Sequence, residues 1–161
     1  MNISMSSQSP AAARGARSQV QMVSGLFGAV FMLVGILGFV PGITATLGSI
    51  TFAGHHTDAA LLGLFQVTVL HNIVHLLFGV VGMLGLRSRS LAKSYLIVGG
   101  IIYAVLWIYA VLWIYGMVIP MESMGTFVGL NTADNWLHFV LAAAMITTGF
   151  EIGRASCRER V

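Results

Sequence analysis

Charged residues are scarce in this 161-residue chain, since only 8% are Asp, Glu, Lys or Arg while 57% are hydrophobic. Soluble domains average about 25% charged residues, so the composition excludes an ordinary soluble domain. The mean hydropathy of +0.90 agrees with this conclusion. We therefore expect the lipid bilayer as the main partner of the chain. The formal net charge of +3 requires no nucleic acid.

Cysteine is almost lacking as well. Cys157, the single one, lies in the charged tail Glu151–Val161, which breaks abruptly from the apolar run before it. One DNA sequence that encodes this tail matches a common sequencing-library adapter. We therefore interpret residues 151–161 as adapter read-through that is not native; the alternative is a genuine basic tail. Cys157 is accordingly given no disulfide, redox or metal role.

The common signatures of catalysis are also missing. The sequence contains no GxSxG, no phosphate-binding loop and no HExxH pattern, and it has no pair of carboxylates within an apolar run. These absences favour a protein without an enzymatic reaction of its own.

Long apolar runs are what the chain does contain. They cover residues 22–40, 59–86, 91–119 and 132–150. Each is about 19 to 29 residues long, enough for one helix to cross a hydrocarbon core about 30 Å thick. Residues 1–18 have no apolar face and are predicted to be a disordered N-terminal segment. The prediction is an all-α, membrane-embedded four-helix bundle over residues 19–150.

The positive charges predict the orientation of this bundle. Arg14 and Arg17 precede the first run, Arg87 and Arg89 lie between the second and third, and Lys93 follows at the start of the third. The links after the first and third runs contain no Lys or Arg. Because Lys and Arg beside membrane spans are retained on the cytoplasmic side, we expect an inner-membrane protein with both termini in the cytoplasm.

Small and polar residues indicate how the helices pack and begin. Gly25, Gly28, Gly35 and Gly38 are spaced along the first run, and spaced glycines let membrane helices approach closely. Asp58 is predicted to be the N-cap of the second helix.

Two similar polar motifs stand out in the apolar runs, HNIVH in the second and DNWLH at the head of the fourth. Within each motif, residues four apart lie on one helix face. Counted from an outer end near Leu61, both histidines of the first motif fall near mid-membrane. The second and fourth helices run in the same direction, so the motifs can converge. We predict a buried polar cluster made of His71, Asn72, His75, Asp134, Asn135 and His138.

Three functions remain open for this cluster. The leading prediction is a hydrogen-bonded network in a structural or accessory membrane module, with other membrane proteins as further partners. The first alternative is a metal-binding or redox protein, in which His71, His75 and His138 hold a transition metal such as zinc, copper or iron. Haem fits less well, because its two axial ligands approach from opposite sides. The second alternative is a small transporter or proton conductor.

A direct repeat lies in the third run, where AVLWIY at residues 104–109 recurs at 110–115. Six residues turn a helix by about 600°, so the copies face about 120° apart and do not form a structural repeat. We interpret the repeat as a small duplication. Trp107 and Trp113 are predicted to serve in packing and interfacial anchoring.

The segments FMLVGILGFVPGIT, LLGLFQVTVLHNIVHLLFGVVGMLGL and NTADNWLHFVLA follow one another over about residues 20 to 150. Together they resemble DUF4383, a bacterial four-transmembrane-helix family of unknown function. The duplicated AVLWIY departs from the single copy expected there. The resemblance implies the topology and the polar positions, and it implies no activity.

Overall fold

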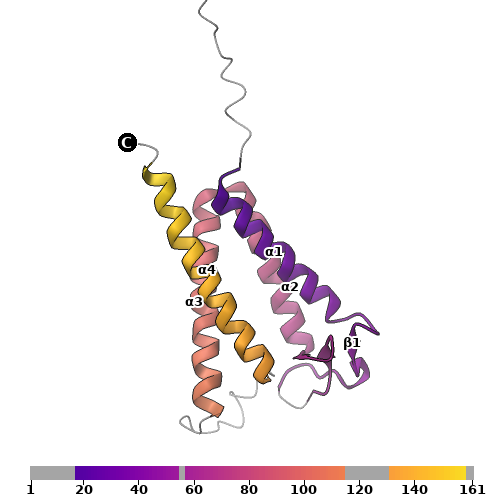
Figure 1. The fold of residues 1–161 in the computed structure, drawn as a ribbon. Helices are drawn as coiled ribbons and strands as arrows, with labels where there is room; N and C mark the ends of the chain where they lie inside the picture. The colour runs from indigo at the N-terminus through magenta and orange to yellow at the C-terminus, as the bar shows by residue number, and fades with distance from the viewer. Residues whose placement is uncertain (1–16, 55–56, 115–130, 159–161) are drawn as a thin grey trace, which may run out of the picture.

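The computed structural model describes residues 17–54, 57–114 and 131–158, which form four long helices. The helices alternate in direction (Figure 1), and α1 packs chiefly on α2 while α3 packs chiefly on α4. The bundle therefore consists of two antiparallel helical hairpins, and the predicted all-α bundle is confirmed. The helices are α1 (Gln19–Leu37), α2 (Val69–Leu84), α3 (Arg89–Ile114) and α4 (Thr132–Arg158).

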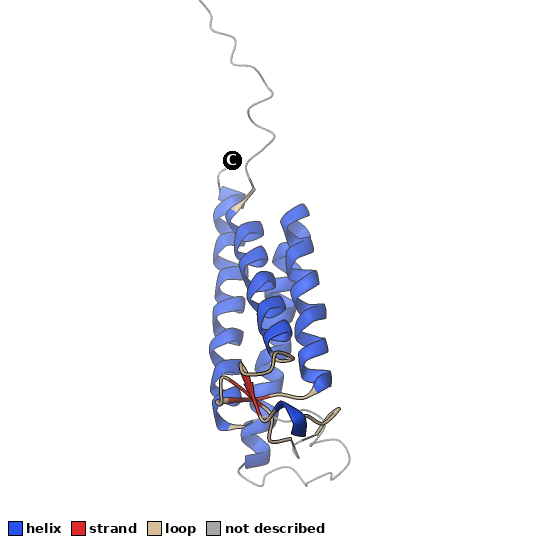
Figure 2. Cartoon of the chain, turned by 90° about the vertical axis from the view of Figure 1, so that its right-hand side faces the viewer, coloured by secondary structure: helices blue, strands red, loops and turns tan. Residues whose placement is uncertain are grey.

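A small folded segment, residues 41–54 and 57–68, joins α1 to α2; we call it the cap. It holds a three-stranded antiparallel sheet in the order β1-β2-β3, and Figure 2 shows this sheet at one end of the helices. Ala59, Leu61 and Val67 form its buried centre. The elements of the cap are β1 (Thr44–Ala45), the 3-10 helix η2 (Leu47–Ser49), β2 (Ala60–Leu61) and β3 (Phe65–Gln66).

The predicted start of the second helix at residue 59 is wrong, because α2 begins at Val69. Leu62 and Gly63 adopt positive φ values of 55° and 70°, so the chain turns there and β2 pairs with β3. Thr68 is the N-cap of α2, since its hydroxyl accepts a hydrogen bond from the His71 amide at 3.1 Å; Asp58 does not cap this helix. In a sequence, a short apolar strand cannot be distinguished from a segment of a helix by its hydrophobic pattern alone. The turn at Leu62 and Gly63 makes the distinction in the structure.

The other helix ends differ less from the prediction. α1 begins at Gln19, three residues early, because the Gln21 side chain accepts a hydrogen bond from the Ser18 amide at 3.0 Å and helps to start the helix. α4 begins at Thr132, as predicted, and continues past residue 150 to Arg158. The predicted disordered N-terminal segment, residues 1–18, lies outside the described residues except for residues 17 and 18. The predicted end of the third helix at residue 119 also lies outside the described residues.

A close crossing joins α1 to α2. A Cβ atom added at Gly28 would lie 2.7 Å from the Gly82 carbonyl carbon and 2.8 Å from the Gly79 carbonyl oxygen. The Ser24 hydroxyl donates a hydrogen bond to the Gly82 carbonyl at 2.9 Å. The helix contact predicted from the spaced glycines is therefore present, and it brings the two backbones together.

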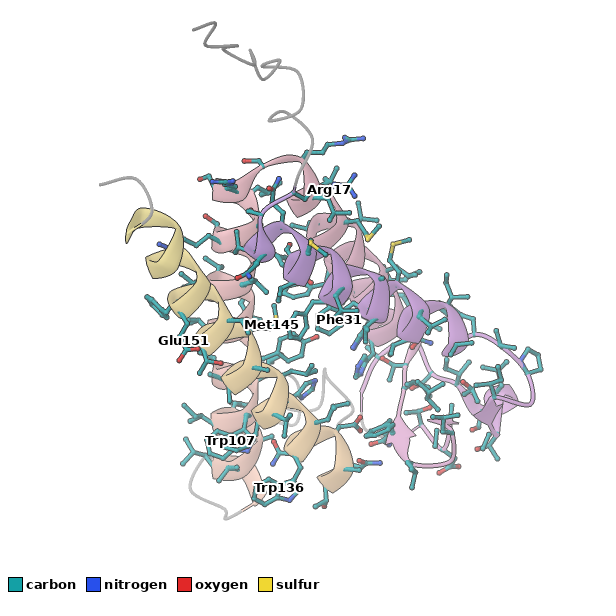
Figure 3. The ribbon with its side chains drawn as sticks, turned by 45° about the horizontal axis from the view of Figure 1, so that its top comes forward. Arg17, Phe31, Trp107, Trp136, Met145 and Glu151 are labelled. Carbon is teal, nitrogen blue, oxygen red and sulfur yellow. The ribbon has the colours of Figure 1, made fainter. Side chains whose placement is uncertain are left out.

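Aromatic side chains fill the space between the two hairpins. Figure 3 shows Phe31 and Met145 in the middle of the bundle, where they are 2% and 0% exposed. The Phe31 ring lies 5.3 Å from that of Phe78 on α2 and 5.5 Å from that of Tyr103 on α3. Phe31 thus links the hairpins through ring contacts.

The outer surface of all four helices is apolar. Leu26, Leu77, Val105 and Val140, one from each helix, are 58% to 64% exposed, whereas monomeric soluble proteins rarely carry large apolar patches. The helical stretches Gln19–Leu37, Val69–Arg87 and Arg89–Leu112 are each long and apolar enough to cross a membrane. These features are those of a membrane protein.

Candidate functional site

Three histidines meet where α2 passes α4. The His71 ring lies 4.4 Å from that of His75 and 6.3 Å from that of His138, measured between ring centroids. The Tyr103 ring on α3 lies 5.0 Å from that of His138. The convergence of the two polar motifs therefore occurs through these imidazoles, and a phenol from α3 joins them.

The histidines lie closer to the cap than the sequence suggests. Because α2 starts at Val69 and not near Leu61, His71 lies in its first turn, and the mid-membrane position of the histidines stays a prediction. His75 and His138 each stand six residues after the first residue of their helix, which corresponds to roughly 9 Å of rise. This equal depth allows His138 to approach the α2 pair.

One hydrogen bond sets the proton position on His75. Its Nδ1 atom lies 3.0 Å from the backbone carbonyl of His71. A carbonyl only accepts, so Nδ1 of His75 carries the hydrogen and, in the neutral ring, Nε2 carries the lone pair. The bond also holds the His75 ring against that of His71, with an angle of 13° between the ring planes.

Asp134 serves a different part of the structure. Its Oδ2 atom accepts hydrogen bonds from the backbone amides of Gln66 in β3 and of Asn131, both at 3.0 Å. Asn131 caps α4 by accepting a hydrogen bond from the Asp134 amide, and its side-chain amide donates to the Leu64 carbonyl at 2.7 Å. We call Asn131 and Asp134 the staple, because they fasten the cap to the start of α4. Asn131 is thus the N-cap of α4, and Asp134 is an acid in its first turn.

The two remaining members of the predicted cluster, Asn72 and Asn135, are buried, and their side chains form none of the staple bonds. Asn72 is 1% exposed and its side chain lies against Gly38 of α1, where an added Cβ would overlap it. Asn135 is 6% exposed. Within the described part of the chain, Asn72 Nδ2 and Asn135 Oδ1 have no hydrogen-bond partner. The six residues therefore divide into an imidazole group, one staple residue and two buried amides.

The comparison with known families bears on both polar motifs. A family model described as a domain of unknown function, DUF4383, matches residues 21–151. The chain belongs to the DUF4383 family. The matched range contains both polar motifs and ends where the predicted non-native tail begins. No curated protein and no solved structure matches the chain. The function of this DUF4383 domain must therefore be inferred from its own geometry.

The imidazole geometry in the DUF4383 domain is unfavourable for a shared metal ion. A metal ion lies in the plane of each imidazole that binds it, about 2.0–2.1 Å from nitrogen for zinc. The His71 and His75 rings are stacked nearly parallel with their centroids 4.4 Å apart, so the in-plane lone pairs of the two rings do not converge on one point within bonding distance of both. In the described residues, no group of three or more His, Cys, Asp or Glu side chains is arranged to hold a metal ion.

Several residues of the site carried little signal in the sequence. Tyr103 belongs to neither polar motif, yet it contacts both Phe31 and His138. Gln66 joins the staple through its backbone amide, which no side-chain pattern reveals. Thr68, by contrast, is indicated by helical spacing, because it extends the face that carries His71 and His75.

Proposed function

We propose that this chain is a multi-pass integral membrane protein with four spans and both termini in the cytoplasm, and that it works as a structural or accessory module without a reaction of its own. Arg17, Arg87, Arg89 and Lys93 lie at the end of the bundle opposite the cap. Positive charge at one end supports a cytoplasmic location for that end and an outer location for the cap. The exposed apolar face of α4 supports its role as the fourth span.

The staple is the observation that carries the accessory function. Asp134 is 3% exposed, and its carboxylate is occupied by two backbone amides. A general acid or base must instead present its carboxyl group to a reacting molecule. The one acid buried in the described bundle thus holds two segments together, which supports a structural role. No observation on the described residues favours the transporter or proton conductor over this function.

The four-span topology predicts opposite accessibility for two exposed serines. Ser49 lies in the cap and Ser90 at the start of α3. In a Cys157→Ser background, a membrane-impermeant maleimide added to spheroplasts is expected to label Ser49→Cys and not Ser90→Cys. Permeabilisation should expose both cysteines. A fluorescent protein fused after residue 150 should remain in the cytoplasm, which checks the fourth span. Labelling of Ser90→Cys in intact spheroplasts would contradict the orientation.

Metal content separates the accessory function from the metal-binding alternative. We expect detergent-purified protein to contain far less than one transition-metal ion per chain, because the stacked rings of His71 and His75 cannot share an ion. Elemental analysis after incubation with zinc, copper or iron and desalting is the measurement. Stoichiometric metal that disappears in a His71→Ala, His75→Ala double variant would reject the proposal, provided that the variant keeps its helical circular dichroism.

A further inference from the structure

A cavity of about 210 Å³ lies between the two hairpins. Leu70 and Val74 from α2 and Leu106 from α3 provide its aliphatic wall. Thr68 and the rings of His71, His75, Tyr103 and His138 complete the lining. The cavity is separate from the staple, because neither Asn131 nor Asp134 lines it.

Two of the side chains that line this cavity, His71 and His138, each carry a buried nitrogen atom without a partner in the described part of the chain. Nδ1 of His71 and Nδ1 of His138 are inaccessible to solvent and make no hydrogen bond to any described residue. His138 as a whole is only 4% exposed. A buried polar atom without a hydrogen bond costs roughly 1–3 kcal/mol, and native proteins rarely leave such atoms unmatched. The imidazoles are therefore suited to a ligand with polar atoms.

The size and walls of the cavity limit what that ligand is. An apolar cavity of about 150 Å³ in another protein accommodates benzene, so this larger one holds a single substituted six-membered ring. The aliphatic wall favours an apolar body over a cluster of waters. No Lys or Arg lines the cavity, which argues against a phosphate or carboxylate head group.

The position of Val74 indicates how the ligand enters. Val74 lines the cavity and is also 49% exposed on the outer face of α2. Its neighbour Leu77 on the same face is 62% exposed, and this face belongs to a helix apolar enough to cross a membrane. A ligand dissolved in the bilayer can therefore insert its ring past Val74 and leave a hydrocarbon chain among the lipids.

We propose that this cavity binds the ring head group of a membrane-soluble quinone or its quinol. A neutral imidazole presents one N–H donor and one lone-pair acceptor, and either nitrogen can carry the hydrogen. His71 and His138 can thus donate to a quinone carbonyl or accept from a quinol hydroxyl. Tyr103 and the imidazoles offer aromatic faces to the ring. The proposal concerns binding and goes beyond the accessory function.

The test compares two probes that differ in their ring oxygens. Decylubiquinone carries carbonyl and methoxy oxygens, whereas decylbenzene carries the same decyl chain on a bare ring. The full chain in lipid nanodiscs is incubated with each probe, and bound probe above that of empty nanodiscs is quantified by chromatography. We expect saturable binding of decylubiquinone at least about tenfold tighter than that of decylbenzene, since hydrogen bonds favour only the former.

Two sets of variants locate the binding. His71→Leu with His138→Leu should weaken decylubiquinone binding about tenfold and leave decylbenzene binding unchanged. Val74→Phe should remove decylubiquinone binding by filling the mouth of the cavity. Val140→Phe is its matched control, because Val140 is 58% exposed on α4 and does not line the cavity; it should change nothing. The comparison of Val74→Phe with Val140→Phe shows whether decylubiquinone binds in the cavity even if the double histidine variant fails to fold.

Three results would overturn the proposal: no saturable decylubiquinone binding, equal affinity for the two probes, or binding that survives Val74→Phe. None of these results affects the proposed accessory function, which is tested by topology, metal content and the staple.

Discussion

Gly28→Ala is expected to lower the free energy of unfolding by about 3 kcal/mol, the upper range for overpacking a tight contact. The added methyl group would lie 2.5 Å from the Met83 backbone nitrogen and 2.7 Å from the Gly82 carbonyl carbon. Backbone atoms cannot rotate away as a side chain can, so α1 and α2 must separate. Separation also weakens the hydrogen bond from Ser24 to the Gly82 carbonyl. Titration of the detergent-solubilised protein with SDS, followed by circular dichroism, measures the change.

Gly48→Ala is the matched control for this substitution. Gly48 lies in the cap, and a Cβ atom added there meets nothing within 4 Å. The same one-methyl change should therefore be neutral or slightly stabilising. If Gly28→Ala and Gly48→Ala unfold at the same SDS fraction, α1 and α2 do not cross at Gly28 as closely as described.

Asp134→Leu is expected to cost about 2–4 kcal/mol of stability, because it leaves two backbone amides without an acceptor. The amides belong to Gln66 in the cap and to Asn131 before α4. The substitution should also loosen the cap, so hydrogen exchange at the Gln66 amide should accelerate. SDS titration and hydrogen exchange by mass spectrometry give the two measurements.

Two further variants make this result specific to the staple. Asp134→Asn keeps one carbonyl oxygen as an acceptor and should lose only about 1 kcal/mol. Asp58→Leu removes an exposed acid from the same cap and should change stability by less than about 0.5 kcal/mol. An equal effect of Asp58→Leu and Asp134→Leu would show that general charge in the cap, and not the staple, controls stability.

The helices were predictable because their signal is local. A chain in lipid must satisfy its backbone hydrogen bonds within each span, so long apolar runs indicate helices without knowledge of their neighbours. The family resemblance, which rests on three contiguous segments and likewise requires no knowledge of the fold, is confirmed. The cap was missed because β2 and β3 are only two residues long. Their pairing depends on the turn at Leu62 and Gly63.

In the candidate site, contacts within one helix were predictable from the sequence, whereas contacts between different elements were not. The stacking of His71 on His75 follows from their four-residue spacing on one helix. The partners of Asn72 and Asp134 do not follow from spacing, since Asn72 lies against α1 and Asp134 binds the cap. The rotation of each helix about its axis decides these contacts, and that rotation is set by packing at Gly28 and Phe31.

By itself, the sequence determined that this protein needs a membrane, that its spans are helical and that the histidines and the acid within its apolar runs lie in two short motifs. Hydropathy, helical periodicity and charge distribution are properties of contiguous residues, so they require no knowledge of the fold. Only the tertiary structure decided that the motifs divide between a staple and an imidazole-lined cavity. That division depends on which side chains from distant segments come within hydrogen-bonding or ring-contact distance, and contiguous sequence does not encode those distances directly.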